Sequence, residues 1–436
     1  MKFFPLYCLL LPLSLWAQAP TSLTLDEALR YGLAHRPDLR SQATQTEVSR
    51  AAADQARNAW LPTVSASADF RVNTQLQTSV LPGEFQNQED PILIRFGTRL
   101  NYLLGVSLDQ PLYQASIRDN ILLADNQVAQ RENQEARLEE TLKLDIAGAY
   151  YAVLLHAEKC SLSQAAVVRA RADLADAEVK QAAGALLRQD YNRLLVALRN
   201  AEATLDTDTR DLATSRRQLN YQIGLPQDAE VIIADSLAAL IQAADRPAPA
   251  FEAENRTELT AERLLLAQNQ LNLNKALHSN RPEVSLYANY SLQHLNDQFN
   301  PFAADTWFPY NYLGLRVNVP IFDRYARRAS VTEYRLQIQV NEENLTQLRR
   351  QLTNTWDQAR TDRETARISL SRAQEDITLA REVLETDRLR FREGALTAAT
   401  LAASQYALSQ SESALLTALY NWLVADLNYQ KATGTL

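Results

Sequence analysis

The sequence has 436 residues, with 44 Lys or Arg and 52 Asp or Glu, so its formal net charge is −8. This mildly acidic balance gives no support to nucleic-acid binding. Only 10 residues are glycine, well below the usual share of about 7%, and the long glycine-free runs predict extended helices rather than two or three ordinary globular domains.

Residues 1–17 predict a secretory signal peptide, with one lysine, an apolar core and a cleavage site at Ala17-Gln18-Ala19. Cys8 lies in a poor match to a lipoprotein acylation sequence, so the mature chain is expected to keep only Cys160 and to form no intramolecular disulfide. No other run of about eighteen apolar residues occurs. We therefore expect an exported protein without a transmembrane helix, which crosses a membrane only as strands.

The mature chain begins with two helices and then changes its hydrophobic period. Thr24 and Glu27 form a predicted capping box at the start of the first helix. Residues 63–73 and 100–109 each alternate between apolar and polar side chains and predict two strands, joined by a polar loop over about 75–98. Each strand has the length that a tilted strand needs to span a bilayer. A half-buried soluble hairpin alternates identically and is the alternative.

A long helical hairpin follows the strands, over residues 114–223. Its first helix runs from Gln114 to Gln181 and would be roughly 100 Å long. Apolar residues recur along it at spacings of three and four, so it needs neighbours along its whole length. The chain turns at Gly184 and returns as a helix over 188–223, which Gly224 ends. A solvated coiled-coil stalk is the alternative interpretation of this hairpin.

The second half of the chain repeats the first. GVSLDQPLY at 105–113 matches GLRVNVPIF at 314–322, Gly184 matches Gly394, and LNYQ at 219–222 recurs at 427–430, with offsets of 208 to 210 residues. The predicted organisation is a first repeat over 18–225 (β-hairpin about 63–109), a connector over 226–256, and a second repeat over 257–436 (helix, β-hairpin about 283–319, long helical hairpin 324–431). We interpret this as a tandem duplication.

Four predicted strands cannot close a membrane barrel, because about eight is the smallest number that closes and lipid tolerates no open edge. Copies of the chain must therefore complete the barrel. Two copies would give eight strands and a filled interior, and three would give twelve strands with room for a channel.

The order of these elements, in duplicate behind a signal peptide, resembles the TolC-like outer membrane efflux proteins. The resemblance covers essentially the whole mature chain. It rests on LTLDEAL at 23–29, ARNAWLPTVSASAD at 56–69, LDQPLY at 108–113, VNVPIF at 317–322, and the two turns GALLRQD at 184–190 and GALTAATL at 394–401.

The resemblance implies a mainly α protomer with a small β portion, which assembles as a trimer. It implies a twelve-stranded barrel in the outer membrane, continued by a helical tunnel in the periplasm. The implied function is a passive exit duct of a tripartite efflux or type I secretion-like system, docked to a periplasmic adaptor and an inner-membrane pump. A secreted or periplasmic helical stalk or adhesin is the alternative.

The family also implies where the tunnel narrows. Acidic residues just past each glycine turn form rings there, and Asp190 matches such a position, with Arg188 nearby. Thr400 and Ala403 occupy the corresponding positions of the second repeat and are not acids. An acid at a helix start also stabilises the helix dipole, which is the structural alternative for Asp190.

The same turns match the residues that contact the adaptor in the family: Gly184, Ala185, Leu186, Gly394, Ala395, Leu396 and Thr397. Leu186 and Leu187 would be exposed at a free tip, which favours a partner there.

Asp69, Arg71 and Arg316 are predicted to line the barrel lumen, with an ordinary solvated strand face as the alternative. Trp307, Phe308, Tyr310 and Tyr312 suit an aromatic girdle at the outer interface, with loop packing as the alternative. The four histidines show no paired metal-ligand spacing, and we find no nucleophile–base pair or phosphate loop. We therefore expect neither an enzyme nor a cofactor.

Overall fold

The computed structural model describes residues 22–81, 92–244, 251–300 and 304–436. The predicted signal peptide lies outside these residues. The chain divides into two compact units, each with segments of both repeats. Unit 1 comprises residues up to Ala43, Asn133–Thr260 and Thr346–Leu436, and unit 2 comprises Thr44–Glu132 and Ala261–Leu345.

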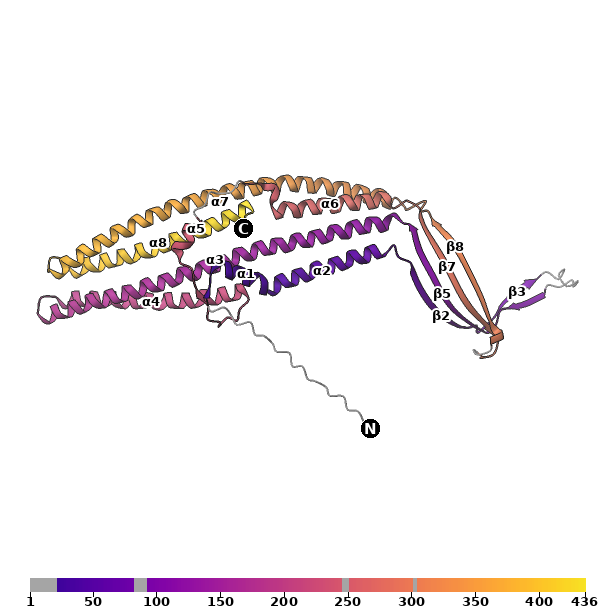
Figure 1. The fold of residues 1–436 in the computed structure, drawn as a ribbon, viewed down its shortest axis with the longest axis horizontal. Coiled ribbons are helices and arrows are strands. Elements are labelled where there is room, and N and C mark those ends of the chain that lie inside the picture. The colour runs from indigo at the N-terminus through magenta and orange to yellow at the C-terminus, as the bar shows by residue number, and fades with distance from the viewer. Residues whose placement is uncertain (1–21, 82–91, 245–250, 301–303) are drawn as a thin grey trace, which may run out of the picture. The chain divides into compact units, whose positions relative to one another are not determined.

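The elements follow one another along the chain, and most of them are labelled in Figure 1. They are β1 (Ser22–Leu23), α1 (Leu25–His35), α2 (Pro37–Asn58), β2 (Thr63–Val72), β3 (Gln77–Leu81), β4 (Ile92–Phe96), β5 (Leu100–Tyr113), α3 (Ala115–Ala182), α4 (Arg188–Ile223), β6 (Ile232–Ile233), α5 (Leu237–Ala244), η2 (Ala253–Asn255), α6 (Thr257–His278), β7 (Glu283–Asn296), η3 (Ala304–Thr306), β8 (Trp307–Asn318), α7 (Ala326–Arg392) and α8 (Ala398–Thr433). The fold is mainly helical with a small β portion, as the sequence predicts. Across the described ranges, no helix combines the length and the apolar character that a membrane span needs.

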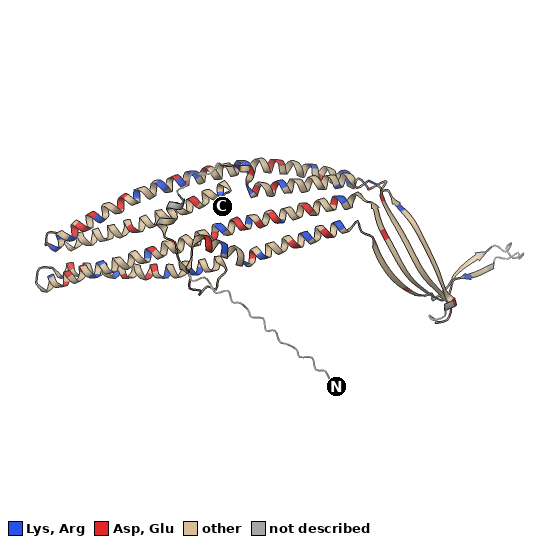
Figure 2. Cartoon of the chain, viewed as in Figure 1, with Lys and Arg blue, Asp and Glu red and all other residues tan. Residues whose placement is uncertain are grey.

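The β portion of unit 2 is an antiparallel sheet in the order β2-β5-β7-β8. Directly paired residues share a face of such a sheet, and alternate residues along a strand share it too. The register therefore assigns every Asp, Glu, Lys and Arg of these strands to one face: Asp69, Arg71, Asp109, Glu283 and Arg316. Figure 2 shows how few charges the four strands carry. We call this face the polar face of the sheet.

The opposite face carries no such charge and exposes large apolar side chains, among them Val64, Leu104, Val106, Leu313, Leu315 and Val317. We call it the apolar face. Near the end of the sheet, one row on this face consists of Phe70, Tyr102, His294 and Trp307, one residue from each strand. Tyr102 stacks on His294 with ring centroids 5.2 Å apart.

Two features of the sheet differ from the sequence-based expectation. The predicted loop at 75–98 contains a hairpin of two five-residue strands, β3 and β4. β8 begins at Trp307, within the expected loop, and its register assigns Trp307 to the apolar face but Phe308, Tyr310 and Tyr312 to the polar face. These three residues therefore do not join Trp307 in one girdle.

The helices of unit 1 end in the same way in both repeats. Gly184 and Gly394 have φ values of +75° and +79°, in the left-handed region that glycine adopts without a steric penalty. The amide of Ala185 donates to the carbonyl of Lys180 at 2.9 Å, and that of Ala395 donates to the carbonyl of Arg390 at 2.8 Å. Both turns are Schellman motifs, so the two glycine turns are confirmed as structural equivalents.

The core of unit 1 surrounds Tyr150 of α3, which is fully buried among residues such as Leu23, Ile146 and Ile223. Its hydroxyl lies 3.0 Å from the carbonyl oxygen of Leu23 and 2.7 Å from Oδ2 of Asp235. Burial, followed by the carboxylate of Asp235, raises the pKa of Tyr150 above its ordinary range. This phenol thus ties α3 to β1 and to the segment between the repeats.

The predicted capping box at the start of α1 is confirmed. The Glu27 amide donates to Oγ1 of Thr24 at 3.4 Å, and the Thr24 amide donates to Oε2 of Glu27 at 2.9 Å. That backbone hydrogen bond is the main reason why the pKa of Glu27 lies below its usual value.

An arginine and an acid two residues later mark the start of α2 and of α6. Arg36 forms an ion pair with Asp38 at 2.5 Å, and buried Arg256 pairs with Glu258 at 2.8 Å. Arg36 also donates to the carbonyl of Gln222 at the end of α4. The duplication thus extends to these charged joints.

Candidate functional site

The turns of the two helical hairpins share one apolar cluster in unit 1. Its buried members come from α3, α4, α7 and α8: Ala177, Leu194, Ile377, Leu384, Phe391, Ala398, Leu401 and Leu408. Leu186 and Leu396, each two residues past its glycine, pack against this cluster. Leu186 is therefore half-buried, whereas Leu187 is 71% exposed. The expectation that both leucines are exposed is wrong for Leu186.

A lysine that the sequence analysis missed connects the two turns. Nζ of Lys180, near the end of α3, donates to the carbonyl of Phe391 at 2.5 Å and lies 4.3 Å from the centroid of the Phe391 ring. It therefore caps the carboxyl end of α7, where unpaired carbonyls and the helix dipole favour a cation. The sequence shows a basic residue in the last turn of α3. It does not show that this residue caps a different helix, α7.

Asp190 lies in the first turn of α4, and its side chain is 21% exposed. Its ion partner is Arg193, with Nη1 3.5 Å from Oδ1, and Arg188, two residues before Asp190, is exposed. In the second hairpin the N-cap Thr397 accepts a hydrogen bond from the Thr400 amide at 3.3 Å. Thr400 thus takes part in the helix cap, and Ala403 is exposed one turn later.

Buried ion pairs join the two hairpins and were also missed by the sequence analysis. Asp173 of α3 pairs with Arg388 of α7 at 2.9 Å, and Arg169 of α3 pairs with Glu412 of α8 at 3.0 Å. Both acids are buried. Removing one partner of a buried pair leaves an uncompensated charge at a cost of about 3–5 kcal/mol. These pairs therefore hold the hairpins in a defined register.

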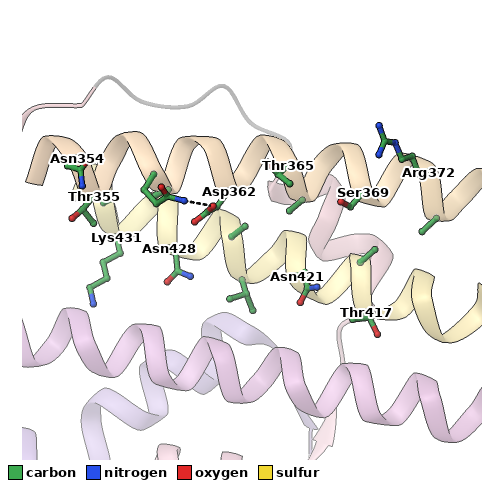
Figure 3. A pocket seen from close by; sticks show the side chains of 18 of the residues that line it. Asn354, Thr355, Asp362, Thr365, Ser369, Arg372, Thr417, Asn421, Asn428 and Lys431 are labelled. Carbon is green, nitrogen blue, oxygen red and sulfur yellow. Dashed lines mark hydrogen bonds between the residues drawn. The ribbon is translucent and has the colours of Figure 1, made fainter.

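A groove of about 1340 Å³ runs between α7 and α8 in unit 1. Figure 3 shows many of its lining side chains, among them the short polar residues Thr355, Ser369, Thr417, Asn421 and Asn428. Gln358 donates to Asp362 across one helical turn at 2.8 Å. A second groove, of about 860 Å³, lies between the α3–α4 hairpin and α8. Both grooves are open along helix pairs and mix polar side chains with alanines and other apolar residues.

The predicted lumen residues share the polar face of the sheet in unit 2. Arg71 lies 3.7 Å from Asp69, and Arg316 lies 3.7 Å from Asp109. The guanidinium of Arg316 also lies 4.8 Å from the centroid of the Tyr287 ring. Within the described segments, no cluster of three or more His, Cys, Asp and Glu side chains is arranged to hold a metal ion.

Solved structures of membrane proteins share this architecture. CusC superposes with a TM-score of 0.76 at 14% identity, covering 94% of this chain and 91% of that chain. The outer membrane protein VceC of Vibrio cholerae gives 0.73 at 15% identity, covering 94% and 96%. The MtrE outer membrane channel of Neisseria gonorrhoeae, in its open state, gives 0.75 at 18% identity, covering 94% and 88%. At these identities the likeness shows the fold.

The family comparison covers both repeats. No curated protein sequence matches the chain significantly. The profile described as "Outer membrane efflux protein" matches residues 29–225 and 252–435, which together are most of the chain and omit little beyond the first residues and the connector. The paired hairpins, the duplicated joints and the four-stranded sheet are thus those of a TolC-like chain, and this protein belongs to the outer membrane efflux protein family.

Proposed function

We propose that this efflux protein works as a homotrimeric exit duct, which conducts substrates passively across the outer membrane. The observation that carries the proposal is the sheet of unit 2. All five of its charged residues lie on the polar face, and the apolar face exposes residues such as Leu313, which is 73% accessible. Such a sheet suits lipid on one side and water on the other.

The edges of the sheet support assembly into a trimer. β2 pairs only with β5, and β8 pairs only with β7, among the strands that the structure describes. Open edges are not tolerated in lipid. Three copies would supply twelve strands and join each β8 to the β2 of a neighbour, which closes a barrel wide enough for a channel. The polar face, with Asp69, Arg71 and Arg316, would then line the lumen.

In the proposed duct, the paired hairpin turns are the place where a periplasmic adaptor docks. The contact residues are Gly184, Ala185, Leu186, Gly394, Ala395, Leu396 and Thr397. Exposed Leu187 supplies apolar area at the same tip. In the proposed system an inner-membrane pump supplies the energy, and this chain provides the passive path.

The proposed constriction lies close to these turns. Three copies of Asp190 would form one acidic ring, with Arg188 at its margin. Thr400 and Ala403 contribute no second ring. Arg193 offsets part of the Asp190 charge. The proposed ring should therefore give the channel only a modest preference for cations over anions.

The test is purification from outer and inner membrane fractions, followed by light scattering in detergent and conductance in planar bilayers. The proposal predicts a heat-modifiable trimer in the outer membrane fraction that forms discrete channels. A soluble monomer, or a trimer without conductance, would contradict the proposal and favour the alternative of a helical stalk.

A further inference from the structure

The polar face of the sheet is unusually aromatic along one strand. Phe308, Tyr310 and Tyr312 occupy alternate positions of β8 and are 52%, 41% and 50% exposed. Alternate residues of a strand are about 7 Å apart, so these three rings form a track about 14 Å long. Large aromatic side chains are normally buried or lie at an interface, and here they are on the face that carries the charges.

The strands beside this track carry small side chains level with Tyr310, whereas Gln293 pairs with Phe308 and Asn289 pairs with Tyr312. The row of Tyr310 contains Ser291, Gly105 and Ser67, and the row of Tyr312 includes Ser107 and Ser65. A Cβ added to Gly105 would lie 3.0 Å from Oγ of Ser291 and 3.6 Å from Oγ of Ser67. Tyr310, in the middle of the track, therefore lies beside a row of serine and glycine that leaves its ring accessible from that side.

One end of the track is held by a tyrosine and an arginine. The Tyr287 ring lies over Gly314, where an added Cβ would come within 2.7 Å of it. Its centroid lies 5.9 Å from that of Tyr312 in an edge-on arrangement. Arg316 lies above Tyr287 and pairs with Asp109. These contacts hold Tyr287 and Arg316 in place at the end of the track next to Tyr312.

The charged residues on the polar face should discriminate only weakly between solutes of different charge. Four of its five charged residues form two pairs, Asp69 with Arg71 and Asp109 with Arg316. Only Glu283 lies outside these two pairs, so the face offers little charge to attract an ion, whereas an uncharged aromatic molecule can stack on the exposed rings.

We propose that the track of Phe308, Tyr310 and Tyr312 is a binding subsite for flat, uncharged aromatic compounds inside the channel. This inference rests on the proposed function, because it requires the polar face to line the lumen. Each protomer of the trimer contributes one track. A solute bound to the track occupies part of the channel lumen and reduces the ion current for as long as it is bound.

The test measures block of single-channel current in planar bilayers by N-acetyl-tryptophanamide, with N-acetyl-leucinamide as the non-aromatic counterpart. Both probes are uncharged, so the comparison isolates the ring. The aromatic probe is expected to block at concentrations at least about threefold lower. One lost aromatic contact changes affinity by about three- to tenfold, so Tyr310→Leu is expected to weaken block by that factor.

Two variants complete the design. Tyr310→Phe keeps the ring and is expected to keep the block. Tyr290→Leu removes an exposed tyrosine from the apolar face of the same sheet and is expected to leave block unchanged. Conducting channels that the two probes block equally, or block that survives Tyr310→Leu combined with Tyr312→Leu, would overturn the inference and leave the duct intact. A folded trimer without conductance would overturn both.

Discussion

Charging the apolar face of the sheet tests the proposed duct most directly. Leu313 is the seventh residue of β8, close to the middle of the strand, and is 73% exposed in the protomer. An arginine at the bilayer midplane costs about 2–4 kcal/mol. Three copies in a trimer would cost roughly 6–12 kcal/mol, which rivals the 5–15 kcal/mol net stability of a typical protein. Leu313→Arg should therefore stop trimer accumulation in the outer membrane.

The matched control is Ser65→Arg. Ser65 follows Val64, which lies in the row of Leu313, but Ser65 points to the polar face. Its loss removes only the hydrogen bond to Ser107, a contribution of about 1 kcal/mol. The assay compares the heat-modifiable trimer band from outer membranes and the yield of refolding into lipid vesicles. Equal tolerance of arginine at both positions would refute the assignment of the two faces.

Three further predictions concern unit 1. Tyr150→Phe removes the hydroxyl beside the Asp235 carboxylate, so α1 should open more easily by about 1.5–3 kcal/mol, seen as faster amide exchange in that helix; unchanged exchange would refute the role of this bond. Although burial, the largest influence, raises the pKa of Glu258, hydrogen bonds from Arg256 and its own backbone hold that pKa below its usual value. The stability that this pair contributes is therefore present above about pH 4.3 and is lost as pH falls through the lowered pKa, so thermal unfolding scans from pH 7 to pH 3 should show an acid-induced loss that Glu258→Gln reduces. Asp190→Ala should reduce the cation preference of the channel in bilayers, and unchanged selectivity in an intact trimer would leave Asp190 a helix-start residue.

Much of the fold follows from local patterns in the sequence. The change from a period near 3.6 to a period of two separates helices from strands, because each period puts apolar residues on one face. Gly184 and Gly394 end helices because the left-handed residue of a Schellman motif favours glycine. The capping box of Thr24 and Glu27 is similarly local. The duplication supports the strand and glycine-turn predictions, since a pattern seen twice at one offset is not accidental.

The sequence could not supply interactions between residues that are far apart in the chain. Lys180 and Phe391, or Asp173 and Arg388, are more than two hundred residues apart, and no local period links them. The start of β8 and the face of its aromatic residues could not be predicted for a different reason. Both of its faces carry aromatic or apolar residues, so alternation alone does not show where the strand begins or which rings face the charges.

The two hairpins solve the same problem at the helix start in different ways. The first amides of a helix lack partners, and the dipole there favours negative charge. In α8, Thr397 satisfies an amide as N-cap, with Thr400 beside it. In α4 the N-cap is Leu187, which offers no side-chain hydrogen bond, and Asp190 in the first turn supplies the negative charge instead. The second repeat therefore needs no acid to stabilise its helix start, and its missing acid leaves the proposed constriction with one charged ring rather than two.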